Sequence, residues 1–311
     1  MDSTPSPRSP RQLKMIRLLK QLAPADGYTE SLLDGVTLMR SDRPLACAQA
    51  LYEPSIVIVV QGRKRGFHGG NVYVYDAQHY LVLSVPLPFD IETEASAAEP
   101  LLGLAMRIEP VMTAELAAGL DEVPVQAAPS PVSMYATGMD DKLEDATLRM
   151  LETLCSPTEA RLLGPSILRE ITYRALVGEQ GASLRAALHQ GSHFGRIAKV
   201  LRRIHSQYAD DLDVATLARE ANLSVPAFHV HFKAMTATSP IQYIKAIRLH
   251  QARLMMIRHG ASAAWASGQV GYESPSQFSR EFRRLFGRSP TQEARHLKSV
   301  LSLAPPVAHQ A

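Results

Sequence analysis

The sequence has little cysteine and no long apolar run, and both absences narrow the class of protein. Two cysteines, Cys47 and Cys155, allow at most one bridge, which fits neither a disulfide framework nor a four-cysteine metal site. No segment reaches the about 18 consecutive apolar residues that a membrane helix requires. The Pro- and Ser-rich start also lacks the apolar core of a secretory signal. We therefore expect a cytoplasmic protein without a membrane partner.

For the two thiols, the simplest interpretation is a pair of small buried apolar side chains, as free cysteines usually are. The alternative is that one of them senses oxidants or electrophiles. Arg43, near Cys47 in the sequence, is the one local feature that would favour a reactive thiolate.

Charge is distributed unevenly along the chain. The net charge is only +3, but residues 195–296 hold 15 Lys and Arg against 7 Asp and Glu, whereas residues 1–194 hold 17 against 23. A basic C-terminal third beside an acidic remainder indicates that the basic part meets a polyanion. The 311 residues also exceed the usual domain length of about 100–200, which predicts two domains.

Strand-forming segments follow a short N-terminal region. Residues 1–10 predict a disordered tail, and the apolar spacing in 11–23 predicts a short amphipathic helix. Closely spaced short strands favour a β-sandwich or small barrel over alternating βα units. Runs of β-branched and aromatic residues between Gly, Asp and Pro predict strands at 55–60, 71–75, 79–83 and 101–106.

Helices replace strands after the Pro-rich segment 124–131. Apolar residues at helical spacing predict helices over 143–154 and 165–176, and the pattern is interrupted near 185–195. The apolar faces of these helices either pack on the β-domain alone or also pair with a second copy in a homodimer. Amphipathic periodicity serves both arrangements, so the sequence leaves them open.

Residues 212–235 have the pattern of a helix-turn-helix unit. Asp213 and Ser224 can cap two successive helices, and Asn222 suits the left-handed residue between them. In such a unit, the exposed residues near the start of the second helix meet base edges in the major groove. The base-reading candidates of this unit are Pro226, Ala227 and His229.

The same pattern recurs at 261–286. Ser274 can cap a second helix that begins at Pro275, and Phe278 and Phe282 face inward from it. Gln and Arg side chains bond bidentately to adenine and guanine edges. The base-reading candidates here are Ser276, Gln277 and Arg280. For phosphate contacts across both units we expect Ser224, Lys245, Arg248, Ser274 and Arg284.

A single helix over 241–258 is predicted to join the two units, with Pro240 at its start and Gly260 after its end. Its length is about 27 Å at 1.5 Å per residue. Successive major grooves on one DNA face lie about 34 Å apart. The helix is therefore near the length that would place both second helices on the same double-stranded DNA.

Residues 270–290, VGYESPSQFSREFRRLFGRSP, resemble the second helix-turn-helix of AraC-type (AraC/XylS) transcriptional regulators. The resemblance covers about 195–297 and implies a seven-helix DNA-binding domain with both units. Segments 52–55, 59–64, 74–75 and 80–88 are similar to the regulatory domain of one AraC-type subgroup, over about 28–185. That similarity implies a cupin-like β-barrel followed by helices, usually a sensor of a small molecule.

These patterns together predict a multidomain α+β protein with an N-terminal cupin-like β-barrel, trailing helices, and an all-α C-terminal domain carrying two helix-turn-helix units. We expect a disordered tail and short helix at 1–27, the regulatory domain at 28–190, the DNA-binding domain at 195–297 and a C-terminal tail at 298–311. The predicted function is sequence-specific transcription regulation under the control of a small-molecule effector. Contact with RNA polymerase is left open.

The effector site is expected inside the β-barrel. Strand alternation alone does not say which face of each strand is inward. The candidate lining residues are Val57, Val59, Tyr73, Tyr75 and Leu83.

Two positions depart from the AraC-type pattern. Val230 stands where family members often carry Arg, and valine cannot donate to guanine, so the first unit should read its bases weakly or through a thymine methyl. Gly268 stands where a larger residue commonly packs, which should loosen that helix by up to about 1 kcal/mol relative to Ala.

The main alternative is a cupin-type metal-dependent enzyme fused to a DNA-binding module. Its ligands would be His68 and His79 with Asp76 and either Glu92 or Glu94, but the strand region has no His-x-His pair. A phosphate-cradling loop before a helix and a Gly-x-Ser-x-Gly elbow are also lacking. A third class, an effector-independent DNA binder, would not need the large acidic N-terminal domain. We expect no enzymatic activity, metal or cofactor.

Overall fold

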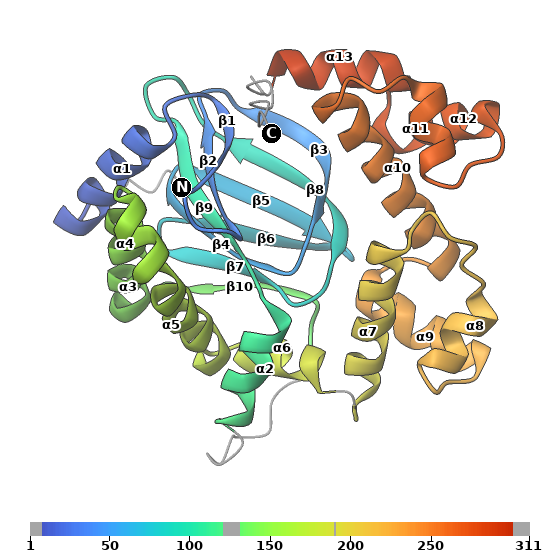
Figure 1. The fold of residues 1–311 in the computed structure, drawn as a ribbon, viewed down its shortest axis with the longest axis horizontal. Coiled ribbons are helices and arrows are strands. Elements are labelled where there is room, and N and C mark those ends of the chain that lie inside the picture. The colour runs from blue at the N-terminus through green and yellow to red at the C-terminus, as the bar shows by residue number, and fades with distance from the viewer. Residues whose placement is uncertain (1–7, 121–130, 190, 301–311) are drawn as a thin grey trace.

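The computed structural model describes residues 8–120, 131–189 and 191–300. In these residues an antiparallel sheet lies between two groups of helices (Figure 1). The strands are β1 (Gly27–Glu30), β2 (Val36–Ser41), β3 (Leu45–Tyr52), β4 (Ser55–Gln61), β5 (Arg63–His68), β6 (Asn71–Asp76), β7 (His79–Leu83), β8 (Leu87–Glu94), β9 (Leu101–Arg107) and β10 (Met134–Gly138).

The helices fall into an N-terminal and a C-terminal group. The first group is α1 (Pro10–Leu22), α2 (Pro110–Ala118), α3 (Asp141–Thr153), α4 (Pro157–Leu162), α5 (Gly164–Val177) and α6 (Gly181–Leu188). The second group is α7 (His193–Ser206), α8 (Val214–Glu220), α9 (Val225–Thr236), α10 (Pro240–Arg258), α11 (Ala263–Gln269), α12 (Pro275–Phe286) and α13 (Pro290–Val300).

The sheet is curled into a half-barrel. Its strand order is β1-β2-β9-β4-β7-β6-β5-β8-β3, with β10 pairing with β7 outside this path. The end strands β1 and β3 do not pair with each other, so the sheet is open there. The expected cupin-like β-barrel is thus present as an open half-barrel.

Burial explains which strands could be predicted from the sequence. Every residue of β4 is buried because helices cover one face of the sheet and the C-terminal group covers the other, so β4 is an unbroken apolar run. The four predicted strands correspond to β4, β6, β7 and β9, which confirms them. Strands β1, β2, β3, β5, β8 and β10 were not predicted, although the buried positions of β8 alternate with half-exposed polar ones such as Asp90 and Glu92, which is itself a strand pattern.

The outer face of the half-barrel packs against α1, α3 and α5 (Figure 1). On β4 this face carries Ile56, Ile58 and Val60, which share a core with Leu19 of α1 and Leu151 of α3. The predicted helices at 11–23, 143–154 and 165–176 are therefore confirmed as α1, α3 and α5, each burying its apolar stripe on the sheet.

The inner face packs against the C-terminal helices. Val57 and Val59, which alternate with the outer residues of β4, belong to one continuous core that includes Ile197 of α7 and Phe232 of α9. Two buried contacts reinforce this junction. Tyr243 of α10 donates to the backbone oxygen of Pro86 at 2.7 Å, and Arg253 donates to that of Gln49 at 2.7 Å.

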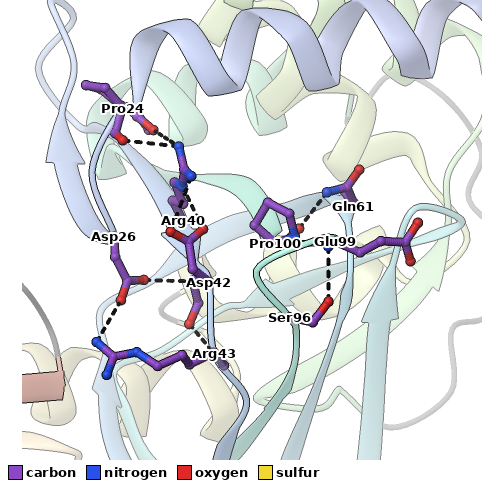
Figure 2. A network of polar contacts seen from close by, with 11 residues as sticks. Pro24, Asp26, Arg40, Asp42, Arg43, Gln61, Ser96, Glu99 and Pro100 are labelled. Carbon is purple, nitrogen blue, oxygen red and sulfur yellow. Dashed lines mark hydrogen bonds and ion pairs between the residues drawn. The ribbon is translucent and has the colours of Figure 1, made fainter.

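A polar network fixes the open edge of the sheet to the end of α1 (Figure 2). Arg40 on β2 donates to the backbone oxygen of Pro24 at 3.1 Å and pairs with Asp42 at 2.8 Å. Asp26 accepts from the backbone nitrogen of Asp42 at 3.1 Å and lies 3.6 Å from Arg43. Arg43 is therefore oriented toward Asp26. From the sequence alone it had been considered as a neighbour that could activate the Cys47 thiol.

Both cysteines are exposed, so the expectation that they are buried is wrong. Cys47 lies on the edge strand β3, beside the irregular pairing between Leu45 and Ala48, and Cys155 follows the end of α3. Partial desolvation, followed by the negative charge of Asp90, raises the pKa of Cys47, and desolvation followed by Glu152 raises that of Cys155. A raised pKa leaves less thiolate at neutral pH, which weakens the sensor alternative for both.

Parts of the expected tails lie outside the described residues, namely 1–7 and 301–311, as does most of the Pro-rich segment 124–131. The C-terminal tail begins later than residue 298, because α13 continues to Val300. No helix in the described part of the chain is long and apolar enough to cross a membrane.

Candidate DNA-binding surface and regulatory domain

Helices α8 and α9 form the first helix-turn-helix unit. Asp213 caps α8 by accepting from the backbone nitrogen of Thr216 at 2.8 Å, and Ser224 caps α9 through the nitrogen of Ala227. Asn222 between them has a φ of 50°, the left-handed conformation that Asn tolerates better than most residues. Capping and turn residues therefore act as the sequence predicted.

Helices α11 and α12 form the second unit in the same way. Ser262 and Ser274 cap them, Pro275 occupies the first turn of α12, and the turn residue Gly271 has a φ of +79°. A Cβ at Gly271 would lie 2.6 Å from the backbone oxygen of Ala209, so this turn requires glycine for space as well as for conformation.

Aromatic pairs fix each second helix to its domain. Phe228 and Phe232 of α9 are 5.4 Å apart between ring centroids, and Phe278 and Phe282 of α12 are 5.5 Å apart. All four side chains are almost fully buried. Because these rings at i and i+4 occupy the inward face, the residues between them are directed outward.

The outward face of each second helix carries the predicted base-reading residues. Pro226, Ser276, Gln277 and Arg280 are exposed, whereas Ala227 and His229 are half-buried. Val230, the departure from the AraC-type pattern, is 67% exposed and so lies on this surface. Gly268 is also exposed, and a Cβ there would meet nothing within 4 Å. An alanine at this position would therefore gain no packing contact, while the expected loosening of the helix relative to Ala rests on helix propensity and stays a prediction.

Glu281 holds several predicted contact residues together. Its carboxylate accepts from Lys245 at 2.7 Å, from the Tyr272 hydroxyl at 2.7 Å and from Gln277 at 3.2 Å. Partial desolvation raises the pKa of Glu281, but the hydrogen bonds from Lys245, Tyr272 and Gln277 outweigh it, and the net pKa is lowered. The acid is thus ionised at neutral pH and orients the side chain of Gln277, the predicted base reader, from one turn away.

The guanidinium of Arg248 is occupied within the protein and is not available to a phosphate. Its guanidinium donates to three backbone oxygens, those of Tyr208 at 2.8 Å, Gly271 at 3.1 Å and Asp210 at 2.8 Å. Arg248 therefore joins α10 to the segments that precede α8 and α12. We assign it to the positioning of the two units. Lys245 is paired with Glu281 but keeps a 30% exposed side chain, and it stays among the phosphate candidates with Arg284, Ser224 and Ser274.

Helix α10 connects the units, as predicted. Ser239 caps it, Pro240 begins it, and Gly260 follows it with a φ of +66°. Its inner side carries Tyr243, His250 and Arg253, each of which is directed into the molecule and none of which the DNA-binding pattern explains. The connecting helix therefore also contacts the half-barrel, as α7 and α9 do.

A half-buried histidine on α7 is expected to make this region sensitive to acid. His205 of α7 lies 6.2 Å from the Tyr243 ring between centroids, and burial lowers its pKa to about 4. The unfolded value is about 6.5, so protonation favours the unfolded chain between these two values. His205 thus contributes stability that is present above pH 6.5 and lost as the pH falls toward 4.

We expect the melting temperature of the wild type to decrease between pH 6.5 and pH 4, and a His205→Leu variant to lose part of that decrease. His250, whose pKa burial also lowers, accounts for another part. Circular dichroism melts at half-unit pH intervals measure this, with exposed His259→Leu as the control. Parallel curves for His205→Leu and the wild type would contradict the assignment.

The candidate effector residues lie on the inner side of the half-barrel. Val57, Val59, Tyr75 and Leu83 are fully buried in the core shared with the C-terminal helices, and Tyr73 is half-buried beside it. The structure thus shows which face of these strands is directed inward, which strand alternation alone did not tell. Of the five, Tyr73 also lines a hollow of about 290 Å³ between β6 and β10.

The residues of the metal-enzyme alternative are dispersed. His79 pairs with Asp76 at 3.1 Å, whereas His68 is directed toward the backbone of Met235 on α9. Glu92 and Glu94 pair with Arg65 instead. In the part of the chain that the structure describes, no three His, Cys, Asp or Glu side chains come together as a metal site.

Sequence reasoning missed Glu281 and the inward role of Arg248 and Arg253. The spacing of Gln277 and Glu281 at i and i+4 was a local signal that they meet on one helix face. The two arginines gave no such signal. Their backbone acceptors lie 23 to 204 residues away, so only the folded chain reveals them.

Two family models match the chain. Residues 32–183 match the AraC-type transcriptional regulator N-terminus, and residues 217–296 match a helix-turn-helix domain. Among solved structures, unsaturated fatty acid-bound ToxT of Vibrio cholerae is similar, with a TM-score of 0.56 and 11% identity over 84% of this chain and 93% of the ToxT chain. At that identity the likeness shows the fold alone.

Curated relatives match over shorter stretches. The Msm operon regulatory protein of Streptococcus mutans is 29% identical over 103 residues, which are 33% of this chain and 37% of that protein. The transcriptional activator RhaS of Escherichia coli is 28% identical over 95 residues, 30% of this chain and 34% of RhaS. The chain thus spans about a third of the length of these curated relatives.

Proposed function

The chain belongs to the AraC-type transcriptional regulators, and on that premise we propose that it binds one double-stranded DNA site with α9 and α12 in adjacent major grooves. The observation that carries this is the common geometry of the two units. In each, a Ser-capped second helix buries a Phe pair and presents its outward residues to solvent. Helix α10, with 19 residues and a length of about 28 Å, joins them as one rigid connection.

In this proposal Ser276, Gln277 and Arg280 read bases from α12, and Pro226, Ala227 and His229 read them from α9. Lys245, Arg284, Ser224 and Ser274 contact phosphates. The division into a regulatory domain at 28–190 and a DNA-binding domain at 195–297 is part of the proposal. Basic residues gather in the second of these, which supports its role as the side that faces the polyanion.

The N-terminal domain is proposed to hold a small-molecule effector. Its inner face shares a core with α7, α9 and α10, so a ligand that changes this face would change the orientation of the DNA-binding helices. ToxT, which shares the fold, is a protein whose structure holds an unsaturated fatty acid. Contact with RNA polymerase and a homodimer belong to the same proposal; for the homodimer, support comes from exposed Leu162 and Leu163 between α4 and α5.

Genome-wide occupancy of the tagged chain in its host tests the proposal. We expect a limited set of sharp peaks that share a motif with two half-sites about 10 base pairs apart, one for each unit. Peaks without a shared motif, or with a single half-site, would contradict binding by both units. Diffuse occupancy that follows nucleic-acid accessibility would favour the effector-independent DNA binder.

A further inference from the structure

Helices α9 and α12 correspond residue for residue. Each begins after a serine cap, buries two phenylalanines one turn apart and ends at a left-handed residue, Ala237 in α9 and Gly287 in α12. The spacing between these points is the same in both helices. Val230 of α9 therefore occupies the position that Arg280 occupies in α12, and the outward residues of the two helices can be compared directly.

The outward side chains at matched positions differ in chemistry. In α12 they are polar, and the amide and guanidinium groups among them can form hydrogen bonds with base edges: Ser276, Gln277 and Arg280. In α9 the corresponding side chains have no donor or acceptor: Pro226, Ala227 and Val230. At these positions the first unit cannot read bases by hydrogen bonds, as the second unit does.

The histidines on either side of Val230 are engaged with the protein. His231 stacks on His193 of α7, with ring centroids 4.3 Å apart. His229 is half-buried, and its ring lies 6.5 Å from that of Phe228 between centroids. Val230 between them is 67% exposed. The first unit thus presents an apolar side chain where the second presents a guanidinium.

Charge around Val230 indicates that DNA, and not an apolar protein surface, is its partner. Lys233, one turn further along α9, is exposed, and its ammonium has no ion pair or hydrogen bond among the described residues. The other end of the helix, at the exposed Ser224 cap, carries the positive end of the helix dipole. Positive charge at both ends of a short apolar stripe is complementary to a groove whose walls are phosphates. Helix α12 has the same arrangement, with Arg283 at the position of Lys233.

The major groove displays one apolar group, the C5-methyl group of thymine. We propose that α9 reads thymine methyl groups through Val230, together with Pro226 and Ala227. The DNA site is then asymmetric, with a thymine-containing half-site at α9 and a half-site read by hydrogen bonds at α12. The chain binds this site in one orientation, because the reverse orientation would place Arg280 over the methyl groups. This inference deepens the proposed DNA binding and rests on it.

Parallel selections from two random duplex libraries test the inference. One library contains thymine and the other uracil, which lacks only the 5-methyl group. From the thymine library the full chain should select two half-sites, and the half-site whose preference Arg280→Ala relaxes belongs to α12. From the uracil library the chain should keep the α12 half-site and lose its preference at the α9 half-site. Loss of preference at both half-sites, or at neither, contradicts the inference.

Fluorescence anisotropy with the selected duplex measures the size of the effect. Replacing one contacted thymine of the α9 half-site by uracil should weaken binding about fourfold, which corresponds to about 0.8 kcal/mol for one buried methylene-sized group. At the same position, 5-methylcytosine should bind more tightly than cytosine, because it places a methyl group at the same point of the groove. Equal binding in either comparison would overturn the inference. Uracil in the α12 half-site should leave the affinity unchanged.

Variants at position 230 connect the effect to this side chain. Val230→Ser should bind the thymine and uracil duplexes equally, and Val230→Arg should in addition prefer guanine at the contacted position, as Arg280 does in the second unit. Val111→Ser, in the first turn of α2, is the matched control, because Val111 is also 67% exposed. This control should keep the preference for thymine over uracil. If Val230→Ser keeps it too, the assignment to Val230 is wrong.

Failure of this inference and failure of the proposed function are distinguishable. Two selected half-sites without a methyl effect would leave the regulator intact and remove the thymine reading. A chain that selects no sequence at all would overturn the proposed DNA binding, and this inference with it.

Discussion

Arg280→Ala should reduce affinity for the specific DNA site by about 5- to 150-fold while nonspecific binding stays nearly unchanged. A bidentate arginine–guanine contact contributes about 1–3 kcal/mol of discrimination. Arg280 is exposed on the outward face of α12, between the buried rings of Phe278 and Phe282, and forms no hydrogen bond or ion pair with the described residues. Its guanidinium is therefore available to the groove without first breaking an internal contact.

Fluorescence anisotropy with a specific and a scrambled duplex, at the same salt concentration, measures both affinities. The control is Arg258→Ala, which removes an equal charge from an exposed position at the end of α10. This variant should weaken both duplexes slightly and equally, since long-range charge carries no sequence information. An equal loss on the two duplexes for Arg280→Ala would assign Arg280 to phosphate instead of base contact.

Phe282→Ala should lower the free energy of unfolding of the second unit by about 3–5 kcal/mol, the usual cost of removing a fully buried phenyl group. The ring is completely buried, 5.5 Å from that of Phe278 and 4.5 Å from that of Phe286 between centroids. Removing it leaves a cavity under the helix that carries Gln277 and Arg280. Specific DNA binding should therefore fall together with stability.

Urea unfolding followed by circular dichroism at 222 nm measures the loss in the least stable transition. Phe282→Leu, which keeps much of the volume, should lose clearly less than the alanine variant. Val230→Ala, at an exposed position on α9, should change stability by no more than about 0.5 kcal/mol. A change for Phe282→Ala as small as that for Val230→Ala would show that this core does not hold the second unit.

Short-range sequence signals were enough to predict the structure of the C-terminal DNA-binding region. Caps such as Ser224 and Ser274, the left-handed residue Asn222, and Phe pairs at i and i+4 act over fewer than five residues, so the sequence alone predicted both units and their outward faces. Unbroken apolar runs likewise revealed β4 and β7, because both faces of these strands are covered. Asymmetry of charge between the two parts of the chain indicated which of them meets a polyanion.

Only the tertiary structure decided what depends on distant segments. Strand alternation defines two faces but not which is inward, and the C-terminal helices decided this by packing against Val57 and Tyr75. Arg248, predicted to reach phosphate, is instead held by backbone oxygens near both units, and Cys47 is exposed because β3 is an edge strand. Lys64 is one residue of a basic run in the sequence, and only the fold buries it against the Tyr52 hydroxyl. Burial and pairing are properties of a whole packed chain, and no spacing of residue types within it encodes them.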